Sequence, residues 1–142
     1  MIILTERPIQ PDEALDDVAH PNAGANLLFL GTTRQWTGDV ETRELKYECY
    51  EEMAAKEMRK LCDEASRHWP LLGLCIIHRL GVVPVGEASL AVAVSSAHRE
   101  PAFAAGQWLI DRLKQVVPVW KQEVDASGQT GWVHPDKQGT SS

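Results

Sequence analysis

The segment Ser95-Ser96-Ala97-His98-Arg99 is the first place in this sequence where residue types and spacing point to chemistry. It runs from the end of an expected strand into the start of an expected helix. The free backbone N–H groups and the positive end of the dipole at such a helix start favour an anion. His98 and Arg99 would add side-chain donors, so the segment predicts an anion site. A surface ion pair of Arg99 and a helix cap formed by His98 would explain the same residues.

Two lysines follow, Lys114 and Lys121, with Pro118 between them, so they cannot share one continuous helix face. Lys114 falls near the expected end of a helix, where a lysine commonly complements the dipole. Lys121 falls in the next expected strand beside Trp120, where its stem would pack on the ring and its ammonium would face water. Taken alone, each lysine favours a structural interpretation.

The distribution of charge makes this region distinctive. The chain has 14 Lys and Arg against 20 Asp and Glu, a net charge of −6, whereas residues 95–124 hold four basic and three acidic side chains. The acidic balance argues against a surface that coats nucleic acid or anionic lipid, so we predict no nucleic-acid and no membrane partner. Arg34 ends an apolar strand and could point into a cleft. The pair His78-Arg79 lies within a strand and is expected to serve packing and a surface charge.

A serine hydrolase is an alternative, with Ser95 or Ser96 and His98 as its reacting groups. The sequence has no Gly-x-Ser-x-Gly elbow and no evident acidic third member. The histidines and the three cysteines show no metal-ligand spacing, so we predict no metal site and no cofactor. The cysteines are odd in number and far apart, which is typical of small core residues in a reducing compartment.

Hydrophobic periodicity predicts the elements that must position these residues. Strands are expected over 1–5, 25–33, 44–50, 74–80, 88–96 and 119–124, and helices over 11–18, 52–69 and 101–117. Gly and Pro in 81–86 predict a hairpin-like connection, and 35–42 and 127–131 are expected to be loops. This order favours an α+β fold with helices on one face of the sheet over a doubly wound parallel sheet.

The length of 142 residues and the 44% hydrophobic content fit one domain, which we assign to residues 1–135, followed by a polar tail at 136–142. No apolar run approaches the ~20 residues that span a bilayer. The amino terminus has no basic flank, long apolar stretch or small-residue cleavage site of a signal peptide. We therefore expect a cytoplasmic protein.

Five segments, in their order and spacing, resemble the large, catalytic subunits of molybdopterin synthase. They are Gly31-Thr32-Thr33-Arg34, residues 45–50, residues 77–81, residues 95–99, and Leu113-Lys114 with residues 118–123. Together they outweigh the structural interpretation that each lysine has alone. The resemblance implies an α+β fold of the α/β-hammerhead type, with a mixed or antiparallel sheet and two long helices.

The resemblance also implies a reaction and an assembly. The reaction is a sulfur transfer, made twice, from the C-terminal Gly-Gly thiocarboxylate of a small ubiquitin-like sulfur-carrier subunit to cyclic pyranopterin monophosphate (precursor Z). Its product is the dithiolene of molybdopterin, in molybdenum cofactor biosynthesis. The implied assembly is a homodimer that carries one small subunit on each protomer, a heterotetramer. A non-catalytic relative that only binds the small subunit or a phosphorylated pterin is the strongest alternative.

By position in the family motifs, the resemblance assigns residues to a substrate pocket. We expect Lys121 to act as acid and base, Lys114 to engage the thiocarboxylate or the substrate, and Arg34, His98 and Arg99 to hold the phosphate and the pterin. The residues that line the pocket are expected to be Thr32, Thr33, Gln122 and Glu123. Glu100-Pro101 places an acid beside the anion site, and the residues after Trp132 match no family segment. Trp36 and Trp132 are candidate contacts with the small subunit, and a place in the core would explain either of them equally well.

Overall fold

A mixed four-stranded sheet forms the larger part of the computed structural model, which describes residues 1–133. Its strands lie in the order β1-β5-β7-β2, and β1 is parallel to β5 while β7 is antiparallel to both of its neighbours. Their bounds are β1 Ile2–Thr5, β2 Ala25–Thr32, β5 Leu71–Arg79 and β7 Ala88–Ser96. The single parallel pair makes the sheet mixed, which is one of the two arrangements that the family resemblance implied.

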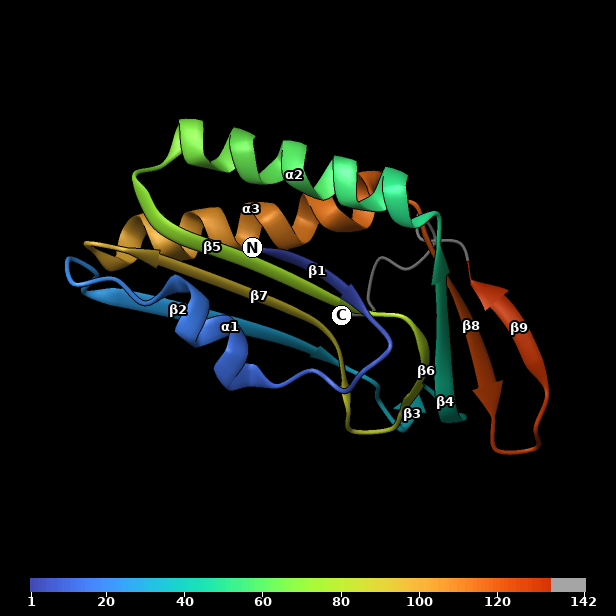
Figure 1. The fold of residues 1–142 in the computed structure, drawn as a ribbon. Coiled ribbons are helices and arrows are strands. Elements are labelled where there is room, and N and C mark those ends of the chain that lie inside the picture. Colours follow the sequence, from blue (N-terminus) through green and yellow to red (C-terminus); the bar gives the residue numbers. More distant parts are fainter. Residues whose placement is uncertain (134–142) are drawn as a thin grey trace.

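Helices cover both faces of this sheet (Figure 1). The two long helices, α2 (Glu51–His68) and α3 (Arg99–Val116), lie side by side on one face, where Leu61 and Leu109 join the larger core cluster. The short helix α1 (Pro11–Val18) packs on the other face. Side chains of the central strands alternate between the two cores, as period-two burial requires. The expectation of helices on one face is correct for α2 and α3 and wrong for α1.

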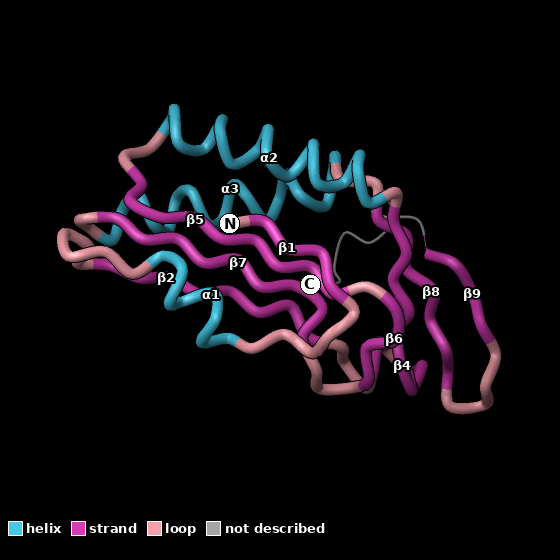
Figure 2. Tube along the Cα trace, viewed as in Figure 1, coloured by secondary structure: helices cyan, strands magenta, loops and turns pink. Residues whose placement is uncertain are grey.

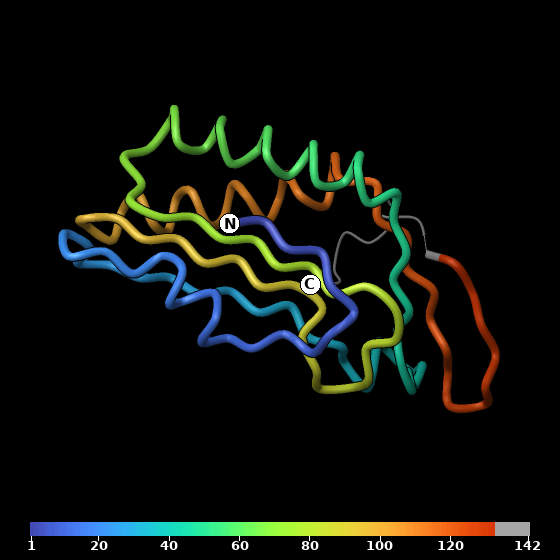
Figure 3. Tube along the Cα trace, in the orientation of Figure 1, coloured from blue at the N-terminus to red at the C-terminus, as the bar shows by residue number. Residues whose placement is uncertain are grey.

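A second sheet stands at one end of the first (Figures 1 and 2). Its path is β3-β4-β8-β9, and β6 also pairs with β4. The bounds are β3 Trp36–Thr37, β4 Val40–Cys49, β6 Gly81–Pro84, β8 Val119–Asp125 and β9 Thr130–Val133. β4 and β8 are antiparallel neighbours over most of their length. Because α3 leads directly into β8, the end of the long helix meets this sheet (Figure 3).

Three of the expected connections contain strands. Residues 35–42 hold β3 and the start of β4, 81–86 holds β6, and the expected loop at 127–131 runs into β9. These strands are two to four residues long, apart from the extension of β4, and so are too short for an alternating pattern to show. In the β8–β9 turn, the Asp125 carboxylate accepts from the Ser127 and Gln129 backbone N–H groups at 3.0 and 2.9 Å.

The remaining elements follow the predicted periodicity, with ends moved by a few residues. Gly106 allows α3 to lie close to β2, because a Cβ at that position would come within 2.7 Å of Leu27. Among residues 1–133, no helix has both the length and the apolar character required to cross a bilayer. The expected tail at 136–142 lies outside the described residues.

Candidate active site

Three predicted cations converge where the two sheets meet. Arg34 follows the end of β2, Lys114 lies in the last turn of α3, and Lys121 lies on β8. Burial is the main cause that lowers the pKa of Lys121; Glu123 opposes it, and the charges of Lys114 and Arg34 lower it further. The pKa of Lys114 is lowered by burial, raised by Asp111 and lowered by Arg34. Arg34 is therefore close enough to affect the pKa of both lysines, and Lys114 is close enough to affect the pKa of Lys121.

A cavity of about 80 Å³ opens beside the two lysines. The side chains that line it come from α2, from α3 and its C-cap, and from the strands of both sheets, and half of them are apolar. They are Tyr47, Met58, His78, Ser89, Leu90, Leu113, Lys114, Val117, Val119 and Lys121. Lys121 is only 5% exposed. A nearly buried ammonium at the edge of an apolar cavity can release or take up a proton more readily than a solvated lysine.

Uncharged polar groups form one wall of this cavity. Tyr47 is the register partner of Lys121 across β4 and β8, so both side chains lie on the same face of the sheet. Its hydroxyl is hydrogen-bonded to Ser89, and its ring meets the His78 ring edge-on with centroids 5.2 Å apart. The His78 Nδ1–H donates to the Arg79 carbonyl at 2.9 Å. Burial lowers the pKa of His78 to about 4, against that hydrogen bond, so its imidazole is neutral at pH 7.

Other residues assigned to the pocket divide between the two faces of their strands. Glu123 shares the face of Lys121, whereas Gln122 alternates to the opposite face and pairs in register with Lys46 and Trp132. Thr33 is buried, and its hydroxyl donates to the Val83 carbonyl at 3.4 Å. Thr32, next to it, is exposed. The structure therefore brings Glu123 to the lysines and does not bring Gln122 to them.

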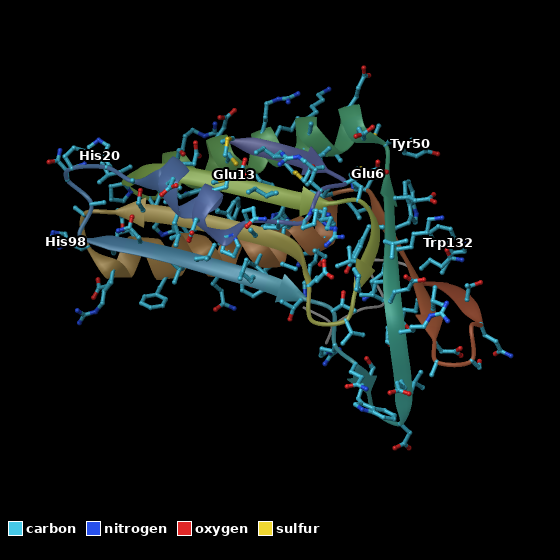
Figure 4. The ribbon with its side chains drawn as sticks, turned by 60° about the horizontal axis from the view of Figure 1, so that its bottom comes forward. Glu6, Glu13, His20, Tyr50, His98 and Trp132 are labelled. Atoms are coloured by element: carbon cyan, nitrogen blue, oxygen red, sulfur yellow. The ribbon has the colours of Figure 1, made fainter. Side chains whose placement is uncertain are left out.

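His98 lies at the other end of the molecule from Tyr50 and Trp132 (Figure 4), and Arg99 follows it in the chain. Arg99 begins α3 and Lys114 lies in its last turn, so about 22 Å of helix separates them at 1.5 Å per residue. His98 precedes α3 without forming a side-chain cap, and Arg99 makes no ion pair within residues 1–133. A single chain therefore does not bring His98 and Arg99 to the lysines.

The two serines cannot supply a hydrolytic nucleophile in this arrangement. Ser95 and Ser96 are fully buried. The Ser95 hydroxyl donates to the Val18 carbonyl at 2.6 Å, and the Ser96 hydroxyl donates to the backbone carbonyl of His98, not to its ring. A buried hydroxyl that is committed to a carbonyl has neither access to a substrate nor a base to activate it.

Sequence reasoning missed three residues near the site. Tyr47 and His78 line the cavity, and Arg79 is not a surface charge, because it is 8% exposed and pairs with Glu87. Tyr47 lies on the apolar face of the alternating strand β4, and His78 lies within the mostly apolar strand β5. Neither position has a local sequence pattern that indicates a functional site. Only the register of β4 against β8, which is a long-range property, places Tyr47 beside Lys121.

The cysteines are thiols at neutral pH. Cys75 is buried and Cys49 and Cys62 are half-buried. Burial, the first cause in each case, raises the pKa of Cys62 and of Cys75 to about 11 and also raises the pKa of Cys49. Within residues 1–133, no three His, Cys, Asp or Glu side chains gather as a metal site requires. A reaction at this site would therefore use cations and not a cysteine thiolate.

Exposed aromatic side chains lie on the second sheet. Trp36 is 54% exposed and Trp132 is 56% exposed, so neither is a core residue. Trp132 lines a surface hollow with Tyr50 and Trp120, whose rings meet edge-on with centroids 5.0 Å apart. Their role as contacts with a small subunit stays a prediction.

Comparisons with known proteins agree on one family. Residues 4–116 match the family described as MoaE protein. The molybdopterin synthase catalytic subunit of Aspergillus niger is 44% identical over 131 residues, which cover 92% of this chain and 73% of that protein. The crystal structure of molybdopterin synthase from Staphylococcus aureus superposes with a TM-score of 0.87 at 33% identity, over 92% of this chain and 95% of that one.

A further structure shares the fold at lower identity. It is the complex of subunits 1 and 2 of the molybdopterin-converting factor from Helicobacter pylori, with a TM-score of 0.76 at 19% identity, over 99% of this chain and 92% of that one. At this identity the likeness shows the fold alone.

Proposed function

The chain belongs to the MoaE family, whose relatives are molybdopterin synthase catalytic subunits in molybdenum cofactor biosynthesis, and from that premise we propose that it catalyses a sulfur transfer. The sulfur donor is the C-terminal thiocarboxylate of a small ubiquitin-like partner. The acceptor is cyclic pyranopterin monophosphate, which receives two sulfurs and becomes the dithiolene of molybdopterin.

Lys114 and Lys121 line one cavity, and Arg34 is close enough to lower the pKa of both; this grouping of three cations is the observation that carries the proposal. The proposed donor is an anionic thiocarboxylate, and the proposed acceptor carries a phosphate. Attack of one on the other develops negative charge on oxygen or sulfur. Preorganised cations stabilise such charge, and each well-aimed donor lowers the barrier by about 3 to 4 kcal/mol. Because the sulfur arrives on the partner, the chain needs no reactive cysteine.

The two lysines differ in their surroundings, and this difference supports separate roles. Lys121 is the more deeply buried and faces the neutral wall of Tyr47 and His78, so it is the group that holds and returns the proton. Lys114, at the end of α3, engages the thiocarboxylate or the substrate. Sulfur leaves the partner only when the acyl–sulfur bond breaks, and water then supplies the oxygen that makes the partner's terminus a carboxylate. On the acceptor, each new C–S bond replaces a C–O bond, whose oxygen stays on the opened phosphate or leaves as water.

A homodimer would complete the pocket. His98 and Arg99 belong to the predicted anion site, yet the length of α3 keeps them about 22 Å from the lysines of the same chain. In a twofold interface the same patch of both chains meets, so a residue of one chain can face a different residue of its partner. In this proposal, His98 and Arg99 of one protomer hold the phosphate in the pocket formed by Arg34, Lys114 and Lys121 of the other.

The small subunit is the second proposed partner. The Helicobacter pylori structure of this fold is a complex of the two subunits of a molybdopterin-converting factor. Exposed Trp36 and Trp132 offer the large amphipathic side chains that are enriched in protein interfaces. The partner's Gly-Gly end would then extend from that surface toward Lys114 and Lys121.

Reconstitution tests the proposal against binding alone. Purified chain is mixed with a thiocarboxylated small subunit and cyclic pyranopterin monophosphate, and the dithiolene product is measured together with complex formation. We expect both complex and dithiolene, and a partner with an ordinary carboxylate terminus should give complex only. A stable complex that never yields dithiolene from the thiocarboxylated partner would overturn the proposal in favour of a binding subunit.

A further inference from the structure

Arg79 and Glu87 form an ion pair on the far side of β5 from the lysine cavity. The Arg79 Nη1 donates to Glu87 Oε1 at 2.7 Å. Arg79 is almost buried, whereas Glu87 lies at the surface in the turn that connects β6 to β7. Strand alternation directs the neighbouring His78 to the cavity and Arg79 away from it. The ion pair is therefore not part of the cavity wall.

The 84–87 turn, which contains Glu87, is hydrogen-bonded to Thr33, the residue that follows β2. The Thr33 N–H donates to the Glu87 carbonyl at 3.0 Å, and the Thr33 carbonyl accepts from the Gly86 N–H at 2.8 Å. The Glu87 N–H donates to the Pro84 carbonyl at 3.1 Å, which closes the turn. Gly86 has a φ of +85°, a conformation that favours glycine. Thr33 is thus fixed by both of its backbone groups to a turn that Arg79 anchors.

Arg34 lies between this anchored residue and a second one. On its other side, the Gln35 carbonyl accepts from the Thr42 N–H at 2.7 Å, and the Gln35 side chain donates to Glu41 Oε2 at 2.8 Å. The Arg34 side chain itself is exposed. Its position relative to the lysines therefore depends on the backbone of Thr33 and Gln35 more than on side-chain packing.

Stability does not explain the ion pair well. Removing charges from water offsets most of the attraction between them, so such a pair is weak evidence for stability. Arg79 Nε is buried with no hydrogen-bond partner among residues 1–133. An unsatisfied buried donor costs about 1 to 3 kcal/mol. An arrangement with this penalty calls for a reason other than folding energy.

We propose that Arg79 and Glu87 are positioning residues for Arg34, and that their ion pair fixes the 84–87 turn against Thr33 so that the Arg34 guanidinium stays beside Lys114 and Lys121. The placement of Arg34 is a statement about the free protein. Its consequence for sulfur transfer rests on the proposed function.

Titration of Lys121 by NMR tests the placement without any substrate. Lysine-labelled protein is titrated as wild type, Arg34→Met, Glu87→Ala and the double variant. Apart from Arg34, the charged or titratable groups around Lys121 are Lys114 and Asp111 on α3, Glu123 on β8, Tyr47 on β4 and His78 on β5, and none of these is changed. Loss of the Arg34 charge should raise the pKa of Lys121, because Arg34 lowers it in the wild type.

The sign of the Glu87→Ala result separates positioning from simple electrostatics. Removing a carboxylate would by itself lower the pKa of a nearby lysine. If the ion pair positions Arg34, Glu87→Ala raises the pKa of Lys121 instead, and adding Arg34→Met raises it no further than Arg34→Met alone. A lowered or unchanged pKa in Glu87→Ala would overturn the proposal. Glu87→Gln, which keeps an acceptor for Arg79, should restore part of the wild-type value.

A matched control breaks an ion pair elsewhere. Glu57→Ala removes the half-buried partner of the exposed Lys60 on α2 and should leave the Lys121 titration unchanged. If Glu87→Ala does not fold, the pKa of Lys121 is compared between Glu87→Gln, Arg34→Met and the wild type instead. Circular dichroism checks that each variant is folded.

Sulfur transfer supplies the second readout, as a double-mutant cycle. Glu87→Ala should slow single-turnover transfer in the wild-type background and have no further effect in the Arg34→Met background, because it acts through Arg34. Equal fold-losses in both backgrounds would contradict positioning. Because the titration needs no turnover, an inactive protein would count against the proposed function and leave the positioning test intact.

Discussion

Arg99 and Lys114 lie at opposite ends of α3, so one rigid helix holds two predicted pocket residues about 22 Å apart. Lys114 meets Lys121 and Arg34 at one end, and Arg99 follows His98 at the other. No side-chain rotation closes that distance. If both groups serve one substrate, two chains must contribute to each pocket, and each dimer then holds two pockets.

Mixing two inactive variants tests this shared pocket. Arg99→Ala and Lys121→Ala should each be nearly inactive as homodimers, because every pocket lacks one residue. After exchange of protomers, each hybrid dimer contains one intact pocket and one doubly defective pocket. We expect single-turnover transfer to recover to about one quarter of the wild-type amplitude when exchange is statistical. Absence of recovery, with hybrid formation verified by differential tags, would place both residues in the pocket of one chain or exclude Arg99 from it.

The burial of Lys121 predicts a gain in stability when it is replaced. Its pKa is lowered in the folded protein, so the unfolded chain binds the proton more strongly. The resulting destabilisation is fully present below the folded pKa and disappears as pH rises toward the ordinary lysine value. Lys121→Met should therefore unfold at a higher temperature than wild type at pH 7, with a difference that shrinks toward pH 10.5. If Lys121→Met were less stable than the wild type at pH 7, the result would contradict the claim that the Lys121 ammonium is poorly solvated.

The burial of His78 predicts that acid lowers the stability of the folded protein. The pKa of His78 falls from 6.5 to about 4 on folding, so stability is lost as pH drops through 6.5 toward 4 and the loss levels off below that. The full effect is of the order of 3 kcal/mol. Urea unfolding at pH 7 and pH 4 should show a smaller acid loss in His78→Gln than in wild type. His20→Gln, at an exposed histidine outside the cavity, is the control for the substitution itself.

The larger elements of the fold could be predicted because each is long enough for a hydrophobic pattern to show in the sequence. The apolar positions of α2 recur at helical spacing, and β7 is a continuous apolar run, so both appear in the sequence as they do in the structure. The short strands β3, β6 and β9 exist because longer neighbours pair with them. Their stability is a tertiary property, and no local pattern reports it.

Some residues of the candidate site could likewise be predicted from the sequence, and others could not. Arg34, Lys114 and Lys121 were found through family motifs, and the structure brings them together. Charge and spacing alone favoured structural interpretations of the lysines, because the convergence depends on contacts between distant segments. Tyr47 and Arg79 were missed for that reason, since one depends on strand register and the other on a turn eight residues away.

Single-turnover sulfur transfer by lysine variants tests the central claim most directly. Thiocarboxylated small subunit and cyclic pyranopterin monophosphate are mixed with wild type, Lys114→Ala, Lys121→Ala and Lys46→Ala, and dithiolene is measured over time. Lys46 is an exposed lysine of β4 and serves as the control. We expect losses of about 10²- to 10³-fold for Lys114→Ala and for Lys121→Ala and a wild-type rate for Lys46→Ala. Wild-type rates in both pocket variants would contradict the account.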